Sequence, residues 1–264
     1  MFTPTDLRRV VDETFVRLVD YHDELPSTND RALRILPEWR EKLPALIVAG
    51  QQTAGRGRNQ NKWWAAPGAL TFSLLAASIK QANLPSPWPA LSMWTAIALR
   101  NALVEFIPTA RVQLKWPNDV FVNGRKVSGV LVESHNSQSD LAVVGVGINV
   151  NNSISEAPDS SSNDDWRSQA ISMRSVAGDE LPLVDVLIGI LKQIEYQWKK
   201  SQINPTSLAG EWRDHCFLTG RTIRWSSGTR EITGVCCGVE EDGAVSINVN
   251  GQQARCYGGV VNSY

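Results

Sequence analysis

Residues 50–58 read GQQTAGRGR, and the stretch continues to KWW at residues 62–64. An apolar run at residues 45–49 leads into this stretch, and a second apolar run at residues 70–76 leads out of it. The stretch is therefore predicted to be a long connection between two buried strands. Connections of this length are uncommon unless they bind a ligand or close over a site.

The composition of this loop suits an anionic or polar ligand. Gly55 and Gly57 permit positive φ and a close approach of the backbone to a ligand. Arg56 and Arg58 carry planar sets of donors that match carboxylate or phosphate, and Gln52 offers both donors and an acceptor. A flexible basic loop, or one that touches nucleic acid, has the same composition, so other positions must converge on it to define a site.

The whole sequence indicates a globular protein without strong charge. It has 264 residues, 42% of them hydrophobic, and a net charge of -1. This gives no global attraction to nucleic acid or to an anionic membrane. No signal peptide or apolar stretch of membrane-spanning length is recognised, so a cytoplasmic protein is predicted. The four cysteines lack CxxC spacing and the three histidines lack metal-ligand spacing, which indicates reduced thiols and no zinc site.

Hydrophobic periodicity predicts helices joined to a sheet, followed by a smaller β module. Thr3 and Pro4 begin a helix that includes Leu18, because apolar residues recur at helical spacing. Further helices are predicted at residues 30–36, 90–106, 183–198 and 205–213. Short β-rich runs are predicted at residues 222–225, 230–237, 244–249 and 253–257. The change from helical periodicity to short β-rich runs predicts a domain boundary near residue 216, which gives domains of residues 1–216 and 217–264.

A second informative stretch reads KWPND at residues 115–119. It leads to a short strand and to Asn123-Gly124, a signal for a two-residue hairpin turn. The return strand, residues 126–133, carries Lys126 and Ser128, which strand alternation places on one face. A lysine in an apolar strand is unfavourable unless it is paired or binds an anion, although an exposed residue after a turn is the simpler alternative. Gly129 indicates close approach by a ligand or another backbone.

A third stretch, VGVGINV at residues 144–150, places Gly145 and Gly147 on one face of a strand. The two glycines leave that face without side chains, and Asn149 lies on the same face with an amide that can recognise a polar ring. A crowded sheet crossing is the alternative. Before the first loop, Ser27 and Thr28 precede a helix, where they cap its N-terminus, contact a polar ligand, or do both.

Taken together, these stretches resemble biotin protein ligases in their order and spacing. The matching pieces are Ser27-Thr28-Asn29, residues 52–58 with Trp63, residues 115–119, residues 125–133 and residues 145–150. The resemblance implies an α+β fold: a mixed β-sheet with packed helices, related to class II aminoacyl-tRNA synthetases, and a small C-terminal SH3-like β-barrel.

The resemblance also implies a reaction and its participants. Biotin and ATP, with Mg²⁺, would give biotinyl-5′-AMP, and the biotin would pass to a lysine of a biotin carboxyl carrier domain of acetyl-CoA carboxylase. The chain resembles the short form of the family, without an N-terminal DNA-binding domain, so a nucleic-acid partner is not expected. An edge strand of the sheet offers a route to a homodimer.

Roles for individual residues follow from the same resemblance. Lys126 and Arg58 are the expected catalytic residues, Asp119 is the expected Mg²⁺ ligand, and Gly55 and Trp63 belong to a loop that closes over biotin. The biotin-binding set is Ser27, Thr28, Asn29, Gln52, Arg56, Gly57, Arg58, Lys126, Gly129, Gly145 and Gly147. The ATP and adenylate set is Arg56, Arg58, Lys115, Lys126, Asn149 and Trp166.

Three other functions fit parts of the sequence. A lipoate or octanoate protein ligase or transferase shares the fold and the carrier-lysine chemistry. A non-catalytic biotin-sensing protein could use the same scaffold, although all the charged candidates for catalysis are present. A nucleic-acid binder could use the Arg-Gly loop, but the chain lacks a basic stripe.

Overall fold

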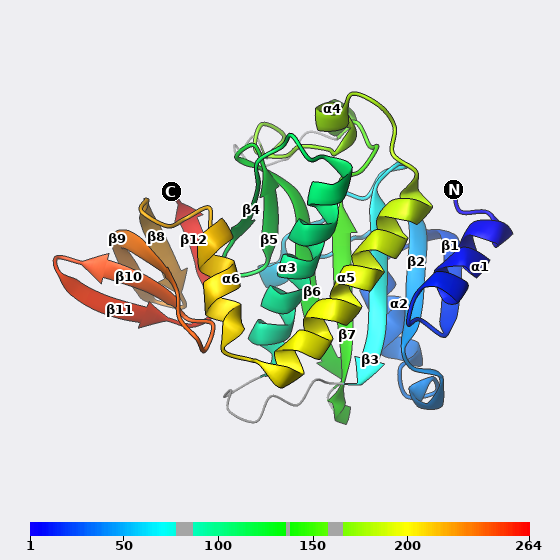
Figure 1. The fold of residues 1–264 in the computed structure, drawn as a ribbon, viewed down its shortest axis with the longest axis horizontal. Helices are drawn as coiled ribbons and strands as arrows, with labels where there is room; N and C mark the ends of the chain where they lie inside the picture. Colours follow the sequence, from blue (N-terminus) through cyan, green and yellow to red (C-terminus); the bar gives the residue numbers. More distant parts are fainter. Residues whose placement is uncertain (78–86, 136–137, 158–165) are drawn as a thin grey trace.

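The larger sheet has seven strands, in the order β1-β2-β3-β7-β6-β5-β4 (Figure 1). The structure is a computed structural model that describes residues 1–77, 87–135, 138–157 and 166–264. β1 and β2 are parallel and the other neighbours are antiparallel, so the sheet is mixed as predicted. The strands are β1 Leu18–Leu25, β2 Ala45–Gln52, β3 Leu70–Ala77, β4 Val112–Lys115, β5 Asp119–Val122, β6 Arg125–His135 and β7 Gln138–Ile148.

The edge strand β1 was not predicted, and the first helix is shorter than its apolar spacing suggests. α1 covers Pro4–Glu13, and Leu18 pairs with Ala45 of β2 instead of continuing the helix. The buried residue of α1 is Val10, whereas Val11 is 36% exposed. Pairing with β2 therefore overrides the local helical periodicity after Glu13.

Helices cover both faces of this sheet. Alternation along β2 sends Leu46 and Val48 into one core cluster, and Ala45 and Ile47 into the other. α3 and α5 pack together on one face, and α2 lies on the opposite face (Figure 1). The remaining helices are short. The helices are α2 Thr28–Ile35, α3 Pro87–Phe106, α4 Arg174–Ala177, α5 Leu183–Ile203 and α6 Ser207–His215, with 3-10 turns at Arg40–Lys42, Arg58–Gln60 and Ile154–Glu156.

The C-terminal segment forms a separate five-stranded antiparallel sheet, in the order β11-β10-β9-β8-β12. Its strands are β8 Thr222–Ser227, β9 Arg230–Val239, β10 Val245–Val249, β11 Gln252–Cys256 and β12 Val260–Ser263. The first four were predicted. β12 was missed because it is only four residues long and follows two glycines. The sheet agrees with the expected SH3-like module.

The C-terminal sheet contacts the β4 edge of the larger sheet (Figure 1). The backbone N–H of Phe217 donates to the carbonyl of Leu114 at 2.8 Å. The indole of Trp116 donates to the carbonyl of Gly243 at 3.0 Å, from a buried position. The strand that ends at Lys115 is therefore fixed from the C-terminal side.

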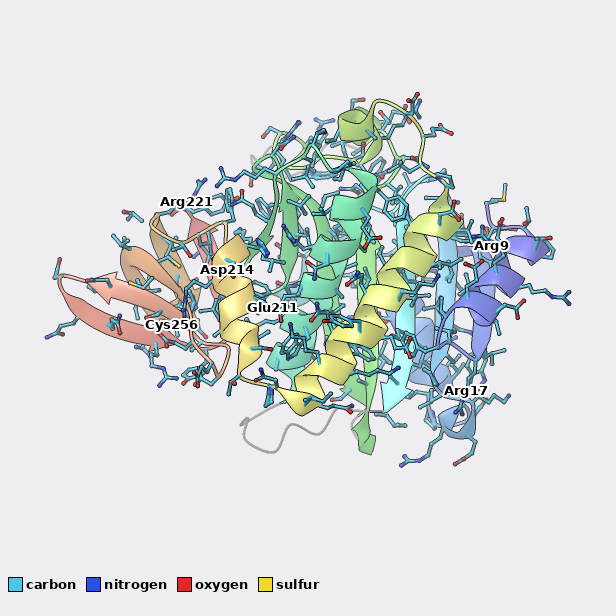
Figure 2. All side chains as sticks on the ribbon, in the orientation of Figure 1. Arg9, Arg17, Glu211, Asp214, Arg221 and Cys256 are labelled. Carbon is cyan, nitrogen blue, oxygen red and sulfur yellow. The ribbon has the colours of Figure 1, made fainter. Side chains whose placement is uncertain are left out.

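Helix α1 and the C-terminal segment lie at opposite ends of the molecule (Figure 1). Figure 2 shows Arg9 on α1 at one end, and Arg221 and Cys256 on the C-terminal segment at the other. Cys216, Cys236, Cys237 and Cys256 are all free thiols. No helix in the described part of the chain has the length and apolar character needed to cross a bilayer.

Candidate active site

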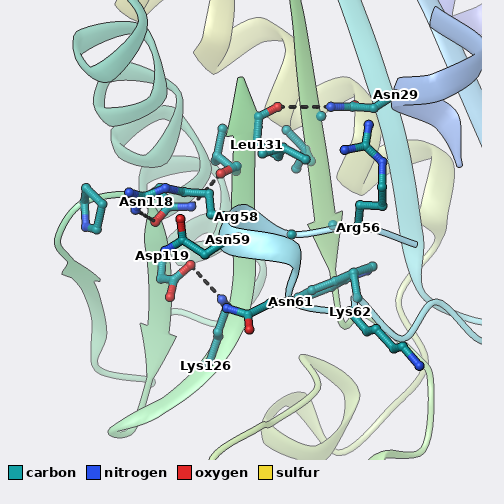
Figure 3. A pocket seen from close by; sticks show the side chains of 18 of the residues that line it. Asn29, Arg56, Arg58, Asn59, Asn61, Lys62, Asn118, Asp119, Lys126 and Leu131 are labelled. Atoms are coloured by element: carbon teal, nitrogen blue, oxygen red, sulfur yellow. Dashed lines mark hydrogen bonds and ion pairs between the residues drawn. The ribbon is translucent and has the colours of Figure 1, made fainter. Parts of the chain in front are cut away.

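The predicted stretches converge on one cavity of about 150 Å³ (Figure 3). Its wall combines the start of α2, the loop between β2 and β3, the β4–β5 connection, β6, β7 and the start of β12. The predicted residues that line it are Ser27, Thr28, Asn29, Gln52, Arg56, Gly57, Arg58, Trp63, Lys115, Asp119, Lys126, Gly129, Gly145 and Gly147. Asn118, Leu131 and Gly259 also line it and were missed.

The start of α2 forms a buried polar wall. Ser27 is its N-cap, and the Ser27 hydroxyl accepts from the backbone N–H of Asp30 at 3.3 Å. The backbone N–H and the hydroxyl of Thr28 donate to Gln52 Oε1 at 2.7 and 3.1 Å. The capping interpretation is therefore confirmed, and the cap is part of the cavity wall.

Asn29 is fixed by three hydrogen bonds. Its Nδ2 donates to Glu133 Oε2 at 2.7 Å and to the Leu131 carbonyl at 3.3 Å, and its Oδ1 accepts from the Ser73 hydroxyl at 2.5 Å. Gly145 faces this amide closely, because an added Cβ would lie 2.1 Å from Asn29 Oδ1. The missing side chain at Gly145 thus makes room for Asn29.

Gly147 makes room for Trp63 in the same way. An added Cβ at Gly147 would lie 2.3 Å from Trp63 Cε2. The Trp63 Nε1 is buried and has no hydrogen-bond partner among the described residues. A buried donor without a partner is unfavourable, so this indole is suited to contact a ligand group or to move when one enters.

Gly55 shapes the loop without lining the cavity. A Cβ added at Gly55 would lie 2.4 Å from the Trp63 carbonyl oxygen. The backbone N–H of Trp63 donates to the Gly55 carbonyl at 2.9 Å. Gly55 and Gly57 do not have positive φ, so the expected left-handed backbone is absent at both positions. Close backbone packing explains Gly55.

Lys126 and Asp119 form an ion pair, with Nζ 2.7 Å from Oδ1 (Figure 3). The hairpin prediction is confirmed, since Asn123 and Gly124 have φ of 49° and 79°. The prediction that Lys126 and Ser128 share a face is wrong. A register shift in the β5–β6 pairing inserts a residue, and Ser128 turns away to donate to the Gly147 carbonyl.

Gly129 instead lies beside Lys126. An added Cβ at Gly129 would lie 3.1 Å from Asp119 Oδ1 and 3.2 Å from Lys126 Nζ. Close approach at Gly129 was predicted, and the pair it accommodates is this lysine and aspartate.

Two further cations approach Asp119. Burial lowers the pKa of Lys115 to about 8, an effect that Asp119 opposes and Lys126 reinforces. Burial also lowers the pKa of Arg58, again opposed by Asp119. Arg58 donates to Asn118 Oδ1 at 3.2 Å and to the Gly259 carbonyl at 3.1 Å. Three cationic side chains around one carboxylate make this end of the cavity suitable for anions.

Arg56 is engaged differently from Arg58. Its guanidinium lies 2.9 Å from Glu133 and 2.6 Å from Asp30, and these hydrogen bonds raise its pKa. A role for Arg56 in binding a carboxylate or phosphate therefore requires these ion pairs to open, and it stays a prediction.

Asn149 and Trp166 are not among the residues that line the cavity. The Asn149 side chain is buried and its Oδ1 accepts from Asn152 at 3.0 Å. Trp166 faces Trp64, with ring centroids 6.3 Å apart. Their assignment to the nucleotide base stays a prediction, and part of the loop between them, residues 158–165, lies outside the described residues.

The oxygen donors at this end of the cavity are few. Among the described lining residues Asp119 is the single carboxylate, and the described part of the chain has no cluster of three or more His, Cys, Asp or Glu suited to a metal. Mg²⁺ commonly uses one or two carboxylates together with phosphate oxygens and water. Asp119 fits that pattern where a nucleotide supplies the remaining ligands.

The chain is similar to known proteins over most of its length. It is 31% identical over 223 residues to the biotin–(acetyl-CoA-carboxylase) ligase of Paracoccus denitrificans. The aligned region covers 83% of this chain and 89% of that relative. The chain belongs to the biotin protein ligase family. The profile of the Biotin/lipoate A/B protein ligase family matches residues 21–151, which contain nearly all the predicted site residues.

Other members of the biotin protein ligase family show the same likeness. The bifunctional ligase/repressor BirA of Bacillus subtilis is 27% identical, with 87% of this chain and 69% of that relative covered. The biotin protein ligase of Aquifex aeolicus in complex with biotin and ATP has a TM-score of 0.79 at 29% identity, over 93% of this chain and 98% of that chain. Its apo structure has a TM-score of 0.74 at 26% identity, over 94% and 100%. The predicted fold class is confirmed.

Proposed function

We propose that this chain is an ATP-dependent ligase that attaches biotin to a lysine of a biotin carboxyl carrier domain. In the first step the biotin carboxylate attacks the α-phosphorus of ATP, and the bond to pyrophosphate breaks, which gives biotinyl-5′-AMP. In the second step the carrier lysine amine attacks the acyl carbon of this mixed anhydride and releases AMP. The observation that carries the proposal is the cluster of Lys115, Lys126 and Arg58 around Asp119.

Lys126 is the proposed main catalyst of the first step. Biotin carboxylate and the α-phosphate repel each other, and an ammonium between them offsets that repulsion and stabilises charge in the transition state. The ion pair with Asp119 at 2.7 Å keeps Lys126 Nζ over Gly129, inside the cavity. Arg58 is the proposed second cation, because its partly buried guanidinium lines the same end.

The polar wall at the start of α2 is the proposed site for the neutral ureido ring of biotin. Thr28, Asn29 and Gln52 present hydroxyl and amide groups from rigid positions, which favours a neutral ligand with donors and an acceptor. Trp63 and the loop around it would cover the aliphatic part and exclude water. Exclusion of water protects the mixed anhydride from hydrolysis.

Asp119 is the proposed residue to hold Mg²⁺ together with nucleotide phosphates. The ion would supply neutralisation of phosphate charge. Lys126 Nζ contacts the same carboxylate at 2.7 Å, so Asp119 would orient the lysine and also supply an oxygen ligand to the ion.

The relatives support the choice of substrate and acceptor. The relatives from Paracoccus denitrificans and Mycobacterium tuberculosis are biotin–(acetyl-CoA-carboxylase) ligases. Two structures of the Aquifex aeolicus biotin protein ligase contain biotin, one of them together with ATP. We extend the proposal to residues 1–216 as the catalytic domain, residues 217–264 as the C-terminal domain, and a cytoplasmic location that suits four free thiols. Pairing of two copies through an edge strand of the larger sheet stays a prediction.

The experiment that tests the function is biotin-dependent exchange of labelled pyrophosphate into ATP, with Mg²⁺ and without any carrier. We expect exchange with biotin and none with lipoate or octanoate. Exchange with lipoate alone would replace biotin by lipoate as the substrate. Calorimetric binding of biotin without exchange would contradict an adenylating enzyme and indicate a biotin sensor.

A further inference from the structure

The Tyr264 ring, directly after β12, lies against Lys115 at the edge of the cavity. Lys115 Nζ is 4.3 Å from the Tyr264 ring centroid and 5.5 Å from the Phe121 ring centroid. The faces of aromatic rings carry negative electrostatic potential, so an ammonium at this distance is attracted to them. The contact joins the end of β4 to the C-terminal sheet.

The Tyr264 ring is itself held in place by two buried rings. Its centroid lies 5.2 Å from Phe217 with an interplanar angle of 82°, and 6.4 Å from Phe121 with an angle of 77°. These are edge-to-face arrangements, which aromatic pairs prefer. Phe121 and Phe217 are only 3% and 6% exposed, so the position of the Tyr264 ring is fixed by the fold.

The position of the Lys115 ammonium depends on the Tyr264 ring, whereas Lys126 is held by a carboxylate. Lys126 has an ion pair with Asp119, whereas Lys115 makes no ion pair with any carboxylate in the described part of the chain. A lysine side chain has about four rotatable bonds, so holding its ammonium in one position costs much rotamer entropy. The rings of Tyr264 and Phe121 are the contacts that impose it.

The residues at the start of β12 and just before it already belong to the cavity wall. Gly259, Val260 and Val261 line the cavity, and the Gly259 carbonyl accepts from Arg58 at 3.1 Å. Two cations of the anion-binding end, Arg58 and Lys115, therefore contact the C-terminal segment directly.

We propose that Tyr264 is a positioning residue for the phosphates of the nucleotide, because its ring face holds the Lys115 ammonium where a phosphate group binds. The proposal rests on the proposed function for the identity of the nucleotide. Tyr264 contacts Lys115 and not the reacting atoms, so its removal weakens nucleotide binding and leaves the biotin wall unchanged. The hydroxyl of Tyr264 is not needed for this role.

The test compares Tyr264→Leu, which removes the ring, with Tyr264→Phe, which keeps it. Binding of α,β-methylene-ATP, which cannot be adenylated, is measured by calorimetry with saturating biotin, and biotin binding is measured without nucleotide. We expect Tyr264→Leu to raise the Kd for the nucleotide roughly three- to thirty-fold, the range of a partly desolvated cation–π contact. Tyr264→Phe should stay within about two-fold of the wild type. Biotin affinity should be equal in all three proteins.

Two further proteins keep the test decisive. Tyr196→Leu makes the same change at an exposed tyrosine of α5, 59% exposed, and should have no effect. A fluorinated phenylalanine at position 264 keeps the size of the ring and removes the negative potential of its face. It should weaken nucleotide binding as the leucine does, even if Tyr264→Leu fails to fold.

The outcomes separate this proposal from the proposed function. Equal nucleotide affinity in the wild type, Tyr264→Leu and the fluorinated protein would overturn the positioning role, as would equal losses in Tyr264→Phe and Tyr264→Leu. Absence of nucleotide binding by the wild type would overturn it as well. Nucleotide binding that responds to the ring, without biotin-dependent pyrophosphate exchange, would support the positioning role and contradict the ligase.

Discussion

Arg56 and Glu133 are 77 residues apart in sequence and form an ion pair of 2.9 Å that ties the loop between β2 and β3 to β6. Asp30 at the start of α2 holds the same guanidinium at 2.6 Å. The loop is therefore fastened at its centre to two rigid elements. Both carboxylates are on elements that form the cavity wall. Breaking the ion pairs of Arg56 would therefore free the loop from the wall of the site.

Replacing Glu133 by Gln should loosen this loop. The amide keeps an oxygen for Asn29 but loses the charge that Arg56 contacts, and a partly exposed ion pair of this kind contributes about 1 kcal/mol at most. Trypsin cleavage after Arg56, Arg58 or Lys62 in the ligand-free protein should become roughly three- to five-fold faster. Glu38→Gln, at an exposed turn, is the control. Equal cleavage rates would show that the pair does not hold the loop.

Replacing Lys126 by Ala should remove most of the adenylation rate. A charged group that stabilises a transition state typically contributes on the order of 10² to 10³ in rate, and we expect a loss of that size in pyrophosphate exchange. Lys199→Ala, at an exposed position of α5, should exchange at the wild-type rate. An exchange rate of Lys126→Ala within a few-fold of the wild type would remove Lys126 from the mechanism.

Adding a methyl group at Gly145 and at Gly147 should give different results. At Gly145 the methyl meets Asn29, which three hydrogen bonds hold in place, so Gly145→Ala should destabilise the fold by about 1–3 kcal/mol. At Gly147 it meets Trp63, which a loop carries and which can swing outward. We therefore expect Gly147→Ala to change Tm little and to weaken biotin binding. Thermal unfolding and calorimetry check both, and equal losses of Tm would contradict the difference in rigidity.

Nucleotide affinity should fall as pH rises through about 8. Burial lowers the pKa of Lys115 to about 8, so the ammonium is charged below that pH and neutral above it. Phosphates bind the charged form, which means that binding takes up a proton and that Kd rises up to about tenfold per pH unit above the pKa. Calorimetry of α,β-methylene-ATP from pH 7 to 9.5 measures this. Lys115→Met should bind more weakly and lose that part of the pH dependence.

The sequence allowed the polar positions of the site to be predicted, because each lies at the end of a recognisable element. Asp119 and Lys126 were expected on two strands joined by a hairpin turn, since Asn123-Gly124 has a strong turn signature. Ser27 was expected to cap a helix. These signals are local, and tertiary contacts did not change them.

The parts that could not be predicted depend on contacts distant in sequence. The bulge that turns Ser128 away from Lys126 has no signature in the alternation of β6. Leu18 fits a helical pattern and becomes a strand because β2 offers it a partner. Tyr264 and Gly259 follow no motif, and only the packing of the C-terminal sheet against β4 brings them to the cavity.

The hydrogen bond from Arg58 to the Gly259 carbonyl spans 201 residues, and this has a consequence during synthesis. At typical elongation rates the ribosome needs roughly 10 to 40 s to make the chain between these two residues. For that time the loop has emerged while the wall that contains Gly259 does not yet exist. The nascent chain therefore cannot form the complete anion-binding end of the cavity, and activity should begin only once the segment around Gly259 has left the exit tunnel.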